Sequence, residues 1–436
     1  MNVIFDTNRN LNMQENIVII GGGFAGINLA KDLGRNKKFS VTLVDQNNYN
    51  FFPPLIYQVA TGFLEPSSIS YPFRKLFAGK DNLHFRLGKL QKVLPAENKV
   101  ILNNGELSYD VLVFATGAET NFFGNENIRK NAIPMKTLGD AIAMRNILLM
   151  RMEQASISKD PQEVKKLLTL VIAGGGPTGV EISGMFAEMK QGILRKDYPE
   201  LKGKAGGIYL VDGGKCVLSP MSEKSQKNTA QALTKMGVEL IMNTHVDDFE
   251  NDTVMLSGGK TISTRNLIWA AGVTARVFEG IPAESYGRGK RMICDAFNLV
   301  KGTANIYAIG DTCLQNNDVN FPDGHPQVAQ VAIQQGKNLA RNFKRKAEGK
   351  EMEAFAYHDK GSMAIIGSAK AVVDLTLPKM HLKGFLAWLA WLFIHLMSLI
   401  TYRNRARTFW NWMIAYFSKD QSLRMIIRPV EEENVT

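Results

Sequence analysis

The sequence predicts an α/β protein with two Rossmann-like dinucleotide-binding domains and a C-terminal membrane-anchoring helical segment. The two domains are predicted by two glycine-rich loops of the same design, which lie about 150 residues apart. The C-terminal segment is predicted by a change in composition. Between residues 379 and 428 there are eight Lys and Arg against one Asp, together with four of the five tryptophans of the chain.

The first glycine loop spans residues 21–26 (GGGFAG) and follows the apolar run 17–20, which we expect to be a strand. A helix should follow and end near Leu33, and a second strand over 41–44 should end at Asp45. The glycines permit a tight turn, close approach to a pyrophosphate, and close packing of helix on strand. The helix N-terminus donates N–H groups to phosphates. The carboxylate then accepts hydrogen bonds from a ribose.

The second loop repeats this design over residues 174–179 (GGGPTG), after a predicted strand over 168–173. The helix that follows places Val180, Ile182 and Phe186 on one face, and the next strand, 208–211, ends at Asp212. The spacing from the loop to Asp212 exceeds the usual ~20 residues, so we expect an insertion at 191–207. Because Asp212 would repel a 2′-phosphate, NADH is predicted in preference to NADPH.

Three further apolar runs, 111–117, 267–272 and 305–311, end in small residues and are predicted to complete the two nucleotide-binding lobes. The last run ends in Gly310 and Asp311, and an Asp in this context can bind a ribityl chain or a phosphate. Two nucleotide sites in one chain predict a flavin nucleotide and a nicotinamide, between which hydride passes.

The composition is that of a globular protein. Of 436 residues 45% are hydrophobic and 21% charged, which excludes intrinsic disorder, a fibrous repeat and a polytopic membrane protein. Cys216, Cys294 and Cys313 are far apart in sequence and form no CxxC, so we expect reduced thiols and no metal site. The polar residues 1–14 lack the apolar core of a secretory signal and predict an N-terminal extension.

The motifs GGGFAG, ATGAETNFFG, GGGPTGVE and NIYAIGD resemble those of two-dinucleotide-binding-domain flavoproteins of the glutathione-reductase type. Residues 54–62 (PLIYQVATG), 329–336 (AQVAIQQG) and 385–417 narrow the resemblance to type II NADH dehydrogenases. These are single-subunit NADH:quinone oxidoreductases of respiratory membranes that pump no protons. The resemblance covers about residues 15–425.

This resemblance implies that the chain has four parts. The extension 1–14 precedes an FAD-binding domain made of 15–125 and 295–340, with an NADH-binding domain, 126–294, inserted into it. A C-terminal domain, 341–436, would carry amphipathic anchor or dimerisation helices at about 382–418. The resemblance further implies noncovalent FAD, a membrane quinone as acceptor, a homodimer, and a peripheral location on the cytoplasmic face of the inner membrane.

The resemblance also implies site residues. Those expected to bind FAD are Gly21, Gly22, Gly23, Phe24, Ala25, Gly26, Asp45, Gln46, Leu90, Thr116, Gly117, Asp311, Val328, Ala329, Gln330, Val331, Ala332 and Ile333. Those expected to bind NADH are Gly174, Gly176, Pro177, Thr178, Gly179, Glu181, Asp212 and Gly272. Glu181 is the expected catalytic residue, and Gln330 and Gln334 are expected at the quinone.

Each expected role has a physical reason and an alternative. A Glu181 carboxyl in an apolar pocket should have a raised pKa and could pass protons to the quinone, but it could also be a carboxylate favoured by the helix dipole. Gln330 and Gln334 could donate to quinone carbonyls or be surface residues one turn apart. His325 and Pro326 predict a helix start with Pro at its first position, directed at the flavin.

The C-terminal segment has three possible structures. The apolar stretch 385–400 would reach ~24 Å as a helix, short of the ~30 Å hydrocarbon core. We expect an interfacial anchor of two amphipathic helices, with Arg403 and Arg407 on one face toward anionic lipid. A helix buried in a dimer and a membrane span are the alternatives. Nucleic-acid binding is disfavoured because it needs no continuous apolar run.

Two other functions share these motifs. A sulfide:quinone oxidoreductase needs a pair of redox cysteines at the flavin, and the sequence predicts none. A membrane-tethered NADH-binding flavoprotein sensor would bind the same nucleotides with little turnover. The leading prediction is an enzyme that transfers hydride from NADH to FAD and two electrons to a quinone.

Overall fold

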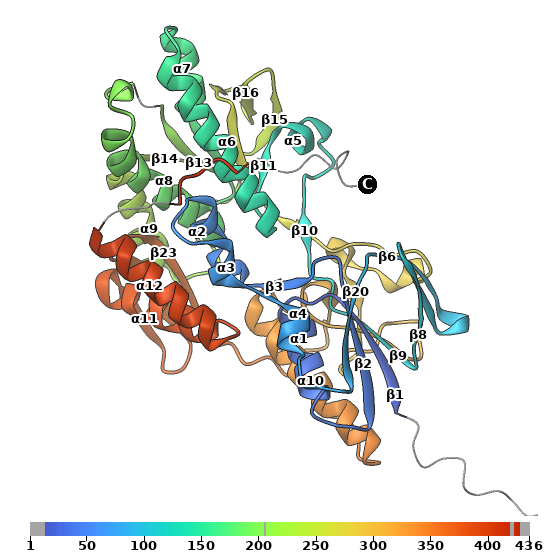
Figure 1. Cartoon of the computed structure of the whole chain (residues 1–436). Helices are drawn as coiled ribbons and strands as arrows, with labels where there is room; N and C mark the ends of the chain where they lie inside the picture. Colours follow the sequence, from blue (N-terminus) through green and yellow to red (C-terminus); the bar gives the residue numbers. More distant parts are fainter. Residues whose placement is uncertain (1–13, 205, 419–422, 428–436) are drawn as a thin grey trace, which may run out of the picture. The chain divides into compact units, whose positions relative to one another are not determined.

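The computed structural model describes residues 14–204, 206–418 and 423–427 (Figure 1). Contacts divide the chain into two compact units. Unit 1 comprises Met1–Asn50, Tyr71–Glu119 and Val273–Asp359, and unit 2 comprises Phe51–Ser70, Thr120–Gly272 and Lys360–Thr436. The predicted assignment of segments to FAD-binding and NADH-binding domains stays a prediction.

Unit 1 is organised around a parallel five-stranded sheet in the order β21-β9-β1-β2-β5. Its strands are β1 (Glu15–Ile20), β2 (Phe39–Asp45), β5 (Leu83–Leu87), β9 (Val111–Phe114) and β21 (Ile306–Ala308). The sheet is buried because β9 and the last four residues of β1 are apolar. Helices α1 (Phe24–Leu33) and α10 (Ala329–Ala347) pack against each other, and Gly336 lets their backbones meet.

Smaller elements complete unit 1. They are the antiparallel sheet β6 (Leu90–Leu94), β7 (Lys99–Leu102) and β8 (Gly105–Ser108), the parallel pair β20 (Met292–Ile293) and β22 (Cys313–Leu314), and α4 (Phe73–Leu76). The short strands β3 (Tyr49–Phe51), β4 (Ser70–Pro72), β10 (Glu119–Thr120) and β19 (Val273–Thr274) lie where the chain passes between the units.

Unit 2 repeats the parallel arrangement in the order β11-β18-β12-β13-β14. Its strands are β11 (Ile133–Pro134), β12 (Leu170–Ala173), β13 (Ile208–Asp212), β14 (Val238–Met242) and β18 (Asn266–Trp269). An antiparallel sheet of β15 (Val246–Glu250), β16 (Thr253–Leu256) and β17 (Thr261–Ser263) follows β14 in the chain.

The helices of unit 2 are α2 (Ile56–Ala60), α3 (Pro66–Ile69), α5 (Glu126–Asn131), α6 (Leu138–Ile157), α7 (Pro161–Leu168), α8 (Pro177–Lys196) and α9 (Glu223–Lys235). The C-terminal part adds the antiparallel strands β23 (Ser362–Gly367), β24 (Lys370–Leu375) and β25 (Met380–Lys383), and the helices α11 (Gly384–Ser398) and α12 (Tyr402–Ser418). No helix in the described ranges combines the length and the apolar character needed to cross a bilayer.

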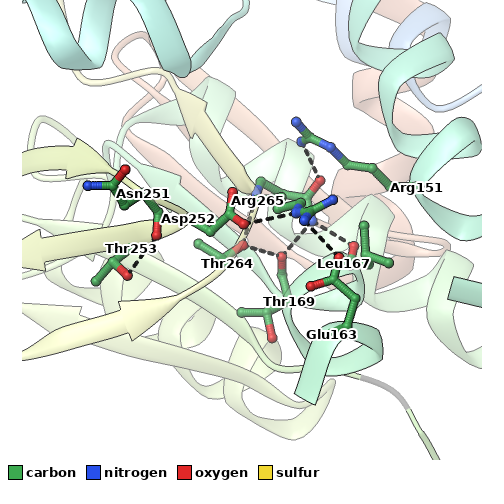
Figure 2. Close-up of polar contacts among 10 residues, drawn as sticks. Arg151, Glu163, Leu167, Thr169, Asn251, Asp252, Thr253, Thr264 and Arg265 are labelled. Atoms are coloured by element: carbon green, nitrogen blue, oxygen red, sulfur yellow. Dashed lines mark hydrogen bonds and ion pairs between the residues drawn. The ribbon is translucent and has the colours of Figure 1, made fainter. Parts of the chain in front are cut away.

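A polar cluster ties α6 and α7 to the edge of the unit 2 sheet (Figure 2). Arg265 pairs with Glu163 at 2.8 Å and with Asp252 at 3.0 Å. Arg151 donates to Asn266 Oδ1 at 2.7 Å, and the Asn266 amide donates to the carbonyls that end α7. Because these partly buried polar groups all have partners, the cluster fixes where α7 ends and β12 begins.

The structure corrects three details of the predicted elements. Leu168 belongs to α7 rather than to the strand that follows. The insertion before Asp212 begins inside α8, which runs to Lys196. Helix α10 begins at Ala329 instead of at Pro326. His325 is only 2% exposed and its Nε2 lies 2.9 Å from Asp318 Oδ2, and the Val328 N–H donates to the Pro326 carbonyl, so the chain bends before the helix starts.

Candidate functional site

The first glycine loop forms a tight cradle at the end of β1. Gly21 has a φ of 106°, and a Cβ there would lie 2.3 Å from the Ala115 carbonyl oxygen. A Cβ at Gly26 would lie 1.9 Å from the Gly21 oxygen, so helix and loop are in backbone contact. A Cβ at Gly23 would meet no described atom within 4 Å, which leaves room for a ligand. The loop therefore has the shape that a pyrophosphate requires.

Asp45 lies beside this cradle at the end of β2. Its Oδ2 accepts a hydrogen bond from Gly22 N at 2.6 Å, and its Oδ1 accepts one from Asn47 N at 2.7 Å. Burial raises the pKa of the Asp45 carboxyl, although these backbone donors oppose the shift. Each oxygen keeps a further lone pair for a ribose hydroxyl. Gln46 is the next residue in the chain.

Two helix N-termini converge near the first loop. Within the described part of unit 1, neither the α1 cap, Gly23, nor the α10 cap, Val328, contributes a side-chain capping bond. A Cβ at Gly310 would contact Ala25 and Ala332 at 3.2 and 3.4 Å, so small residues bring both helix starts together beside Asp311. Uncapped N–H groups and positive helix ends favour an anion here.

Buried hydroxyls support the same interpretation. Thr116 Oγ1 and Thr312 Oγ1 are buried and have no hydrogen-bond partner among the described residues. Such groups cost about 1–3 kcal/mol each unless a ligand or water satisfies them. The residues present therefore fit a bound flavin dinucleotide, with Thr116 and Gly117 at the end of β9 and Asp311 after β21.

The remaining residues expected at FAD differ in exposure. Val331 and Ala332 are buried on the inner face of α10, Leu90 is buried in a core cluster, and Val328 is exposed. Ala329, Gln330 and Ile333 occupy the first turns of α10, and Gln330 has an interaction partner. All the residues expected at FAD lie in unit 1.

The glutamines of α10 have distinct environments. Gln334 Nε2 donates to the His358 carbonyl at 2.9 Å, and its Oε1 accepts from His358 N at 3.0 Å. Gln335, which was not predicted from the sequence, is 1% exposed, and its Oε1 accepts from Gly310 N at 2.7 Å. Gln335 therefore positions the Gly310 turn. Its place three residues after Ala332, on the inner face of α10, was the available signal.

The second glycine loop has the same geometry in unit 2. Gly174 has a φ of 112°, and a Cβ at Gly179 would lie 1.8 Å from the Gly174 oxygen. The space beside Gly176 is free of described atoms within 4 Å. Asp212 Oδ2 accepts from Gly175 N at 2.6 Å and its Oδ1 accepts from Gly214 N at 2.6 Å, which repeats the arrangement at Asp45.

The rest of the nicotinamide side is also assembled in unit 2. Pro177 and Thr178 begin α8, whose buried face includes Val180, Ile182 and Phe186 as the sequence predicts. Gly272 has a φ of 147° just after β18. All the residues expected at NADH, with Glu181, thus belong to one compact unit, while Gln330 and Gln334 belong to unit 1.

Glu181 is a buried carboxyl in the first turns of α8. It is 8% exposed, and burial raises its pKa well above the ordinary value, although the Ile365 backbone N–H donates to it. Helix α8 approaches β23 so closely that a Cβ at Gly184 would lie 1.7 Å from the Ile366 carbonyl oxygen. The C-terminal strand therefore builds the apolar environment that favours the neutral acid.

Tyr57 lies near Glu181 and is linked through Gln58 to Trp412, and none of these three residues was predicted as a site residue from the sequence. Gln58 Nε2 donates to the Tyr57 hydroxyl at 3.0 Å, and Trp412 Nε1 donates to Gln58 Oε1 at 2.7 Å. Burial and the nearby Glu181 raise the pKa of Tyr57. The motif PLIYQVATG contains Tyr57 and Gln58, but only the tertiary structure joins them to α12.

The structure brings two of the cysteines together, which their spacing in the sequence does not show. Cys294 and Cys313 are neighbours in unit 1, where the parallel pairing of β20 with β22 brings their buried thiols into hydrogen-bond contact. Burial and this contact raise the pKa of Cys294 well above its usual range. The sequence could not show this pair because 19 residues separate the two cysteines.

Comparisons with known proteins agree with this architecture. Residues 15–336 match the pyridine nucleotide-disulphide oxidoreductase family, and residues 359–419 match the NDH2 C-terminal domain. The type II NADH:quinone oxidoreductase NdhA of Mycobacterium tuberculosis is 33% identical over 92% of this chain and 87% of that protein. Ndh of the same organism is also 33% identical, over 92% and 88%.

A solved structure has the same fold. NDH2 of Plasmodium falciparum in complex with NADH superposes with a TM-score of 0.86 at 22% identity, over 95% of this chain and 100% of that one. The predicted dinucleotide-binding fold, FAD and nicotinamide cofactors and NADH:quinone oxidoreductase activity are confirmed. The chain belongs to the type II NADH:quinone oxidoreductases, flavoenzymes that pass electrons from NADH to a quinone.

Proposed function

We propose that Glu181 supplies protons for quinone reduction in this enzyme and that α11 and α12 hold it on a membrane surface. The overall reaction consumes NADH, a proton and a quinone and yields NAD⁺ and a quinol. The observation that carries the proposal is the buried Glu181, held by the Ile365 N–H near Tyr57, in the same compact unit as α11 and α12.

The two glycine loops do the binding. The first loop and the start of α10 hold the FAD pyrophosphate, and Asp45 takes the adenosine ribose. The second loop holds NADH, with Asp212 on its ribose. FAD, when bound, takes up hydride from NADH and gives two electrons to the quinone.

The preference for NADH is a consequence of Asp212. Its carboxylate oxygens accept two backbone N–H bonds at 2.6 Å and so cannot turn away from a 2′-phosphate. We expect Asp212→Ser to raise KM for NADH about tenfold while improving NADPH use relative to NADH. An unchanged ratio of kcat/KM for the two nucleotides would contradict this role.

Glu181 can carry a proton because the neutral acid is the favoured form. In that state it donates from its carboxyl oxygen to the developing quinol and is recharged from solvent. Gln58 and Trp412 orient Tyr57 beside it through two hydrogen bonds. Gln330 and Gln334 remain the proposed amide donors to quinone carbonyls. Gln334 would give up its bond to the His358 carbonyl to do so.

The C-terminal helices present an apolar surface with basic neighbours. Phe385, Leu389, Phe393 and Met397, four residues apart on α11, are all exposed, with Phe393 at 66%. On the other face of α11, Ala387 and Trp391 are fully buried. A helix with one buried and one exposed apolar face fits an interfacial anchor.

Helix α12 continues this surface. Trp410, Met413 and Ile414 are exposed, while Trp412 and Ala415 are buried. Arg403, Arg405 and Arg407 all lie in its first half, where they can face anionic headgroups on the cytoplasmic side of the inner membrane. The family resemblance further implies a homodimer, which light scattering of the detergent-solubilised protein would test.

Anaerobic stopped-flow absorbance near ~450 nm tests the relay. NADH should bleach the flavin band, and a soluble quinone should restore it promptly. Glu181→Gln should keep the bleaching phase and slow the recovery phase about 10²-fold. If the flavin of the parent protein bleached but did not recover, the result would contradict quinone reduction. It would favour the alternative of an NADH-binding flavoprotein sensor.

Membrane attachment is best tested by surface substitutions. Removing the C-terminal helices would also remove the buried Trp391 and Trp412 and expose the core of unit 2. Phe385→Ser with Phe393→Ser should instead weaken co-sedimentation with anionic vesicles at least tenfold without loss of folding. The matched control is Ile157→Ser, an exposed apolar residue on α6, which should leave binding unchanged. An equal loss of vesicle binding in the double variant and in Ile157→Ser would contradict the role of α11 as a membrane anchor.

A further inference from the structure

Unit 2 contains a cavity away from its nucleotide loop. It lies between α6, the end of α7, α8 and the segment around Arg424, and its volume is 70 Å³. Apolar side chains form most of its wall: Leu148, Leu149, Met152, Leu167, Leu168, Leu170, Phe186, Met189 and Ile208. Leu170 and Ile208 begin β12 and β13, whereas the nicotinamide loop follows the other end of β12, about 10 Å away.

A buried arginine with two nitrogens that find no hydrogen-bond partner among the described residues lines this cavity. Arg145 is 4% exposed, and its Nε and Nη2 make no hydrogen bond within the described chain. Burial lowers its pKa. A guanidinium taken out of water without an anion destabilises the folded protein by several kcal/mol.

The neighbouring arginines have partners, unlike the Nε and Nη2 atoms of Arg145 among the described residues. On the same helix, Arg151 donates to Asn266, and burial lowers its pKa to about 10 (Figure 2). Arg265 pairs with two carboxylates (Figure 2). Unit 2 therefore supplies partners to its other partly buried arginines in this region, and leaves Arg145 facing a cavity.

The rest of the cavity wall also favours an anion. Lys190 Nζ donates to the Gly206 carbonyl at 2.8 Å, and Arg424 pairs with Asp197 at 2.6 Å. Among the described residues that line the cavity there is no Asp or Glu. Because Asp197 neutralises Arg424, the positive potential of the cavity comes mainly from Arg145 and Lys190, and the apolar walls suit a hydrocarbon chain.

We propose that this cavity binds a short-chain carboxylate, with the carboxylate on Arg145 and the alkyl chain between α6 and α8. A guanidinium suits a carboxylate because it can donate two parallel hydrogen bonds. At roughly 10–15 Å³ of accessible volume per water, the cavity holds about five waters, which is comparable to a chain of about six carbons. The site is independent of the proposed roles of Glu181 and the membrane helices.

Calorimetric titration of the FAD-loaded full chain with hexanoate tests the proposal. Hexan-1-ol, which has the same chain without the charge, should bind at least tenfold more weakly. Affinity should rise about fourfold per methylene from butanoate to hexanoate and then level off, because the cavity is full. A rise that continued unchanged to decanoate would show partition into detergent and would overturn the site.

Substitutions in the cavity distinguish binding at this site from nonspecific binding of hexanoate. Arg145→Met should lower hexanoate affinity at least tenfold and leave hexan-1-ol binding unchanged. Because Arg145 has no described partner to lose at Nε and Nη2, this variant should unfold at the same or a higher temperature than the parent. Leu149→Trp, which fills the cavity, should abolish binding with Arg145 intact.

The control is Arg129→Gln, a substitution that removes the same charge from the exposed helix α5. It should leave hexanoate affinity within twofold of the parent. Unchanged affinity in Arg145→Met, equal loss in Arg129→Gln, or no hexanoate binding to the parent at millimolar concentration would each overturn the proposal.

Discussion

Replacing Glu181 with Gln removes a buried carboxyl whose neutral form the structure favours. In the unfolded chain this carboxyl loses its proton near pH 4.5, whereas in the folded protein burial keeps the proton bound to a much higher pH. The contribution of this group to stability is therefore fully present below pH 4.5 and is lost as the pH rises toward the folded pKa.

The size of the effect follows from linkage. Between the two pKa values unfolding releases one proton, so the parent loses about 1.4 kcal/mol of stability per pH unit from this group. The amide in the Glu181→Gln variant carries no such proton, so the stability of the variant relative to the parent should rise at that rate once the pH exceeds about 4.5, until the pH reaches the folded pKa. For a unit of this size the difference in unfolding temperature should widen by about 3–5 °C per pH unit.

Two assays check this reasoning. Thermal unfolding of both proteins at half-unit pH intervals gives the stability difference, and stopped-flow recovery with quinone gives the rate. The control is Glu250→Gln, which makes the same substitution at an exposed position on β15. A constant stability difference for Glu181→Gln would refute the buried neutral acid, and a parental quinone rate at every pH would refute its proton role.

Two substitutions test the packing around the pocket. Trp412→Phe removes the donor to Gln58 Oε1 and leaves a buried oxygen unsatisfied, so it should destabilise the protein by about 1–3 kcal/mol in thermal unfolding, whereas Trp410→Phe, at a side chain 63% exposed, should change stability by less than about 0.5 kcal/mol. Gly184→Ala should separate α8 from β23 and lower soluble yield and quinone turnover, while Gly192→Ala on the same helix should fold normally or be slightly more stable. If the two variants of either pair were equally stable, the result would contradict the contact that the pair tests.

Local sequence patterns were sufficient to predict the two nucleotide-binding lobes. A turn that requires a positive φ admits little but glycine, and the residues that follow it start a helix, so α1 was predicted to its last residue. The acidic residues at the ends of β2 and β13 were identified because each ends the strand that follows its loop and helix. Both carboxylates hold a glycine N–H of their own loop.

Long-range contacts decided what the local patterns left open. The first turn of α10 was misplaced because the chain bends before it, where His325 contacts Asp318. The pairing of Cys294 with Cys313 comes from strand register, which spacing in the sequence does not encode.

The same limit applies to the chemistry of the pocket and the cavity. A glutamate after a glycine loop is recognisable in sequence, but its protonation depends on burial by β23, a strand about 180 residues later. The bond from Trp412 on α12 to Gln58, and the lack of any described partner for Arg145 Nε and Nη2, likewise exist only in the folded unit. Sequence determines which groups are present, and the tertiary structure determines which of them lose water and which find a partner.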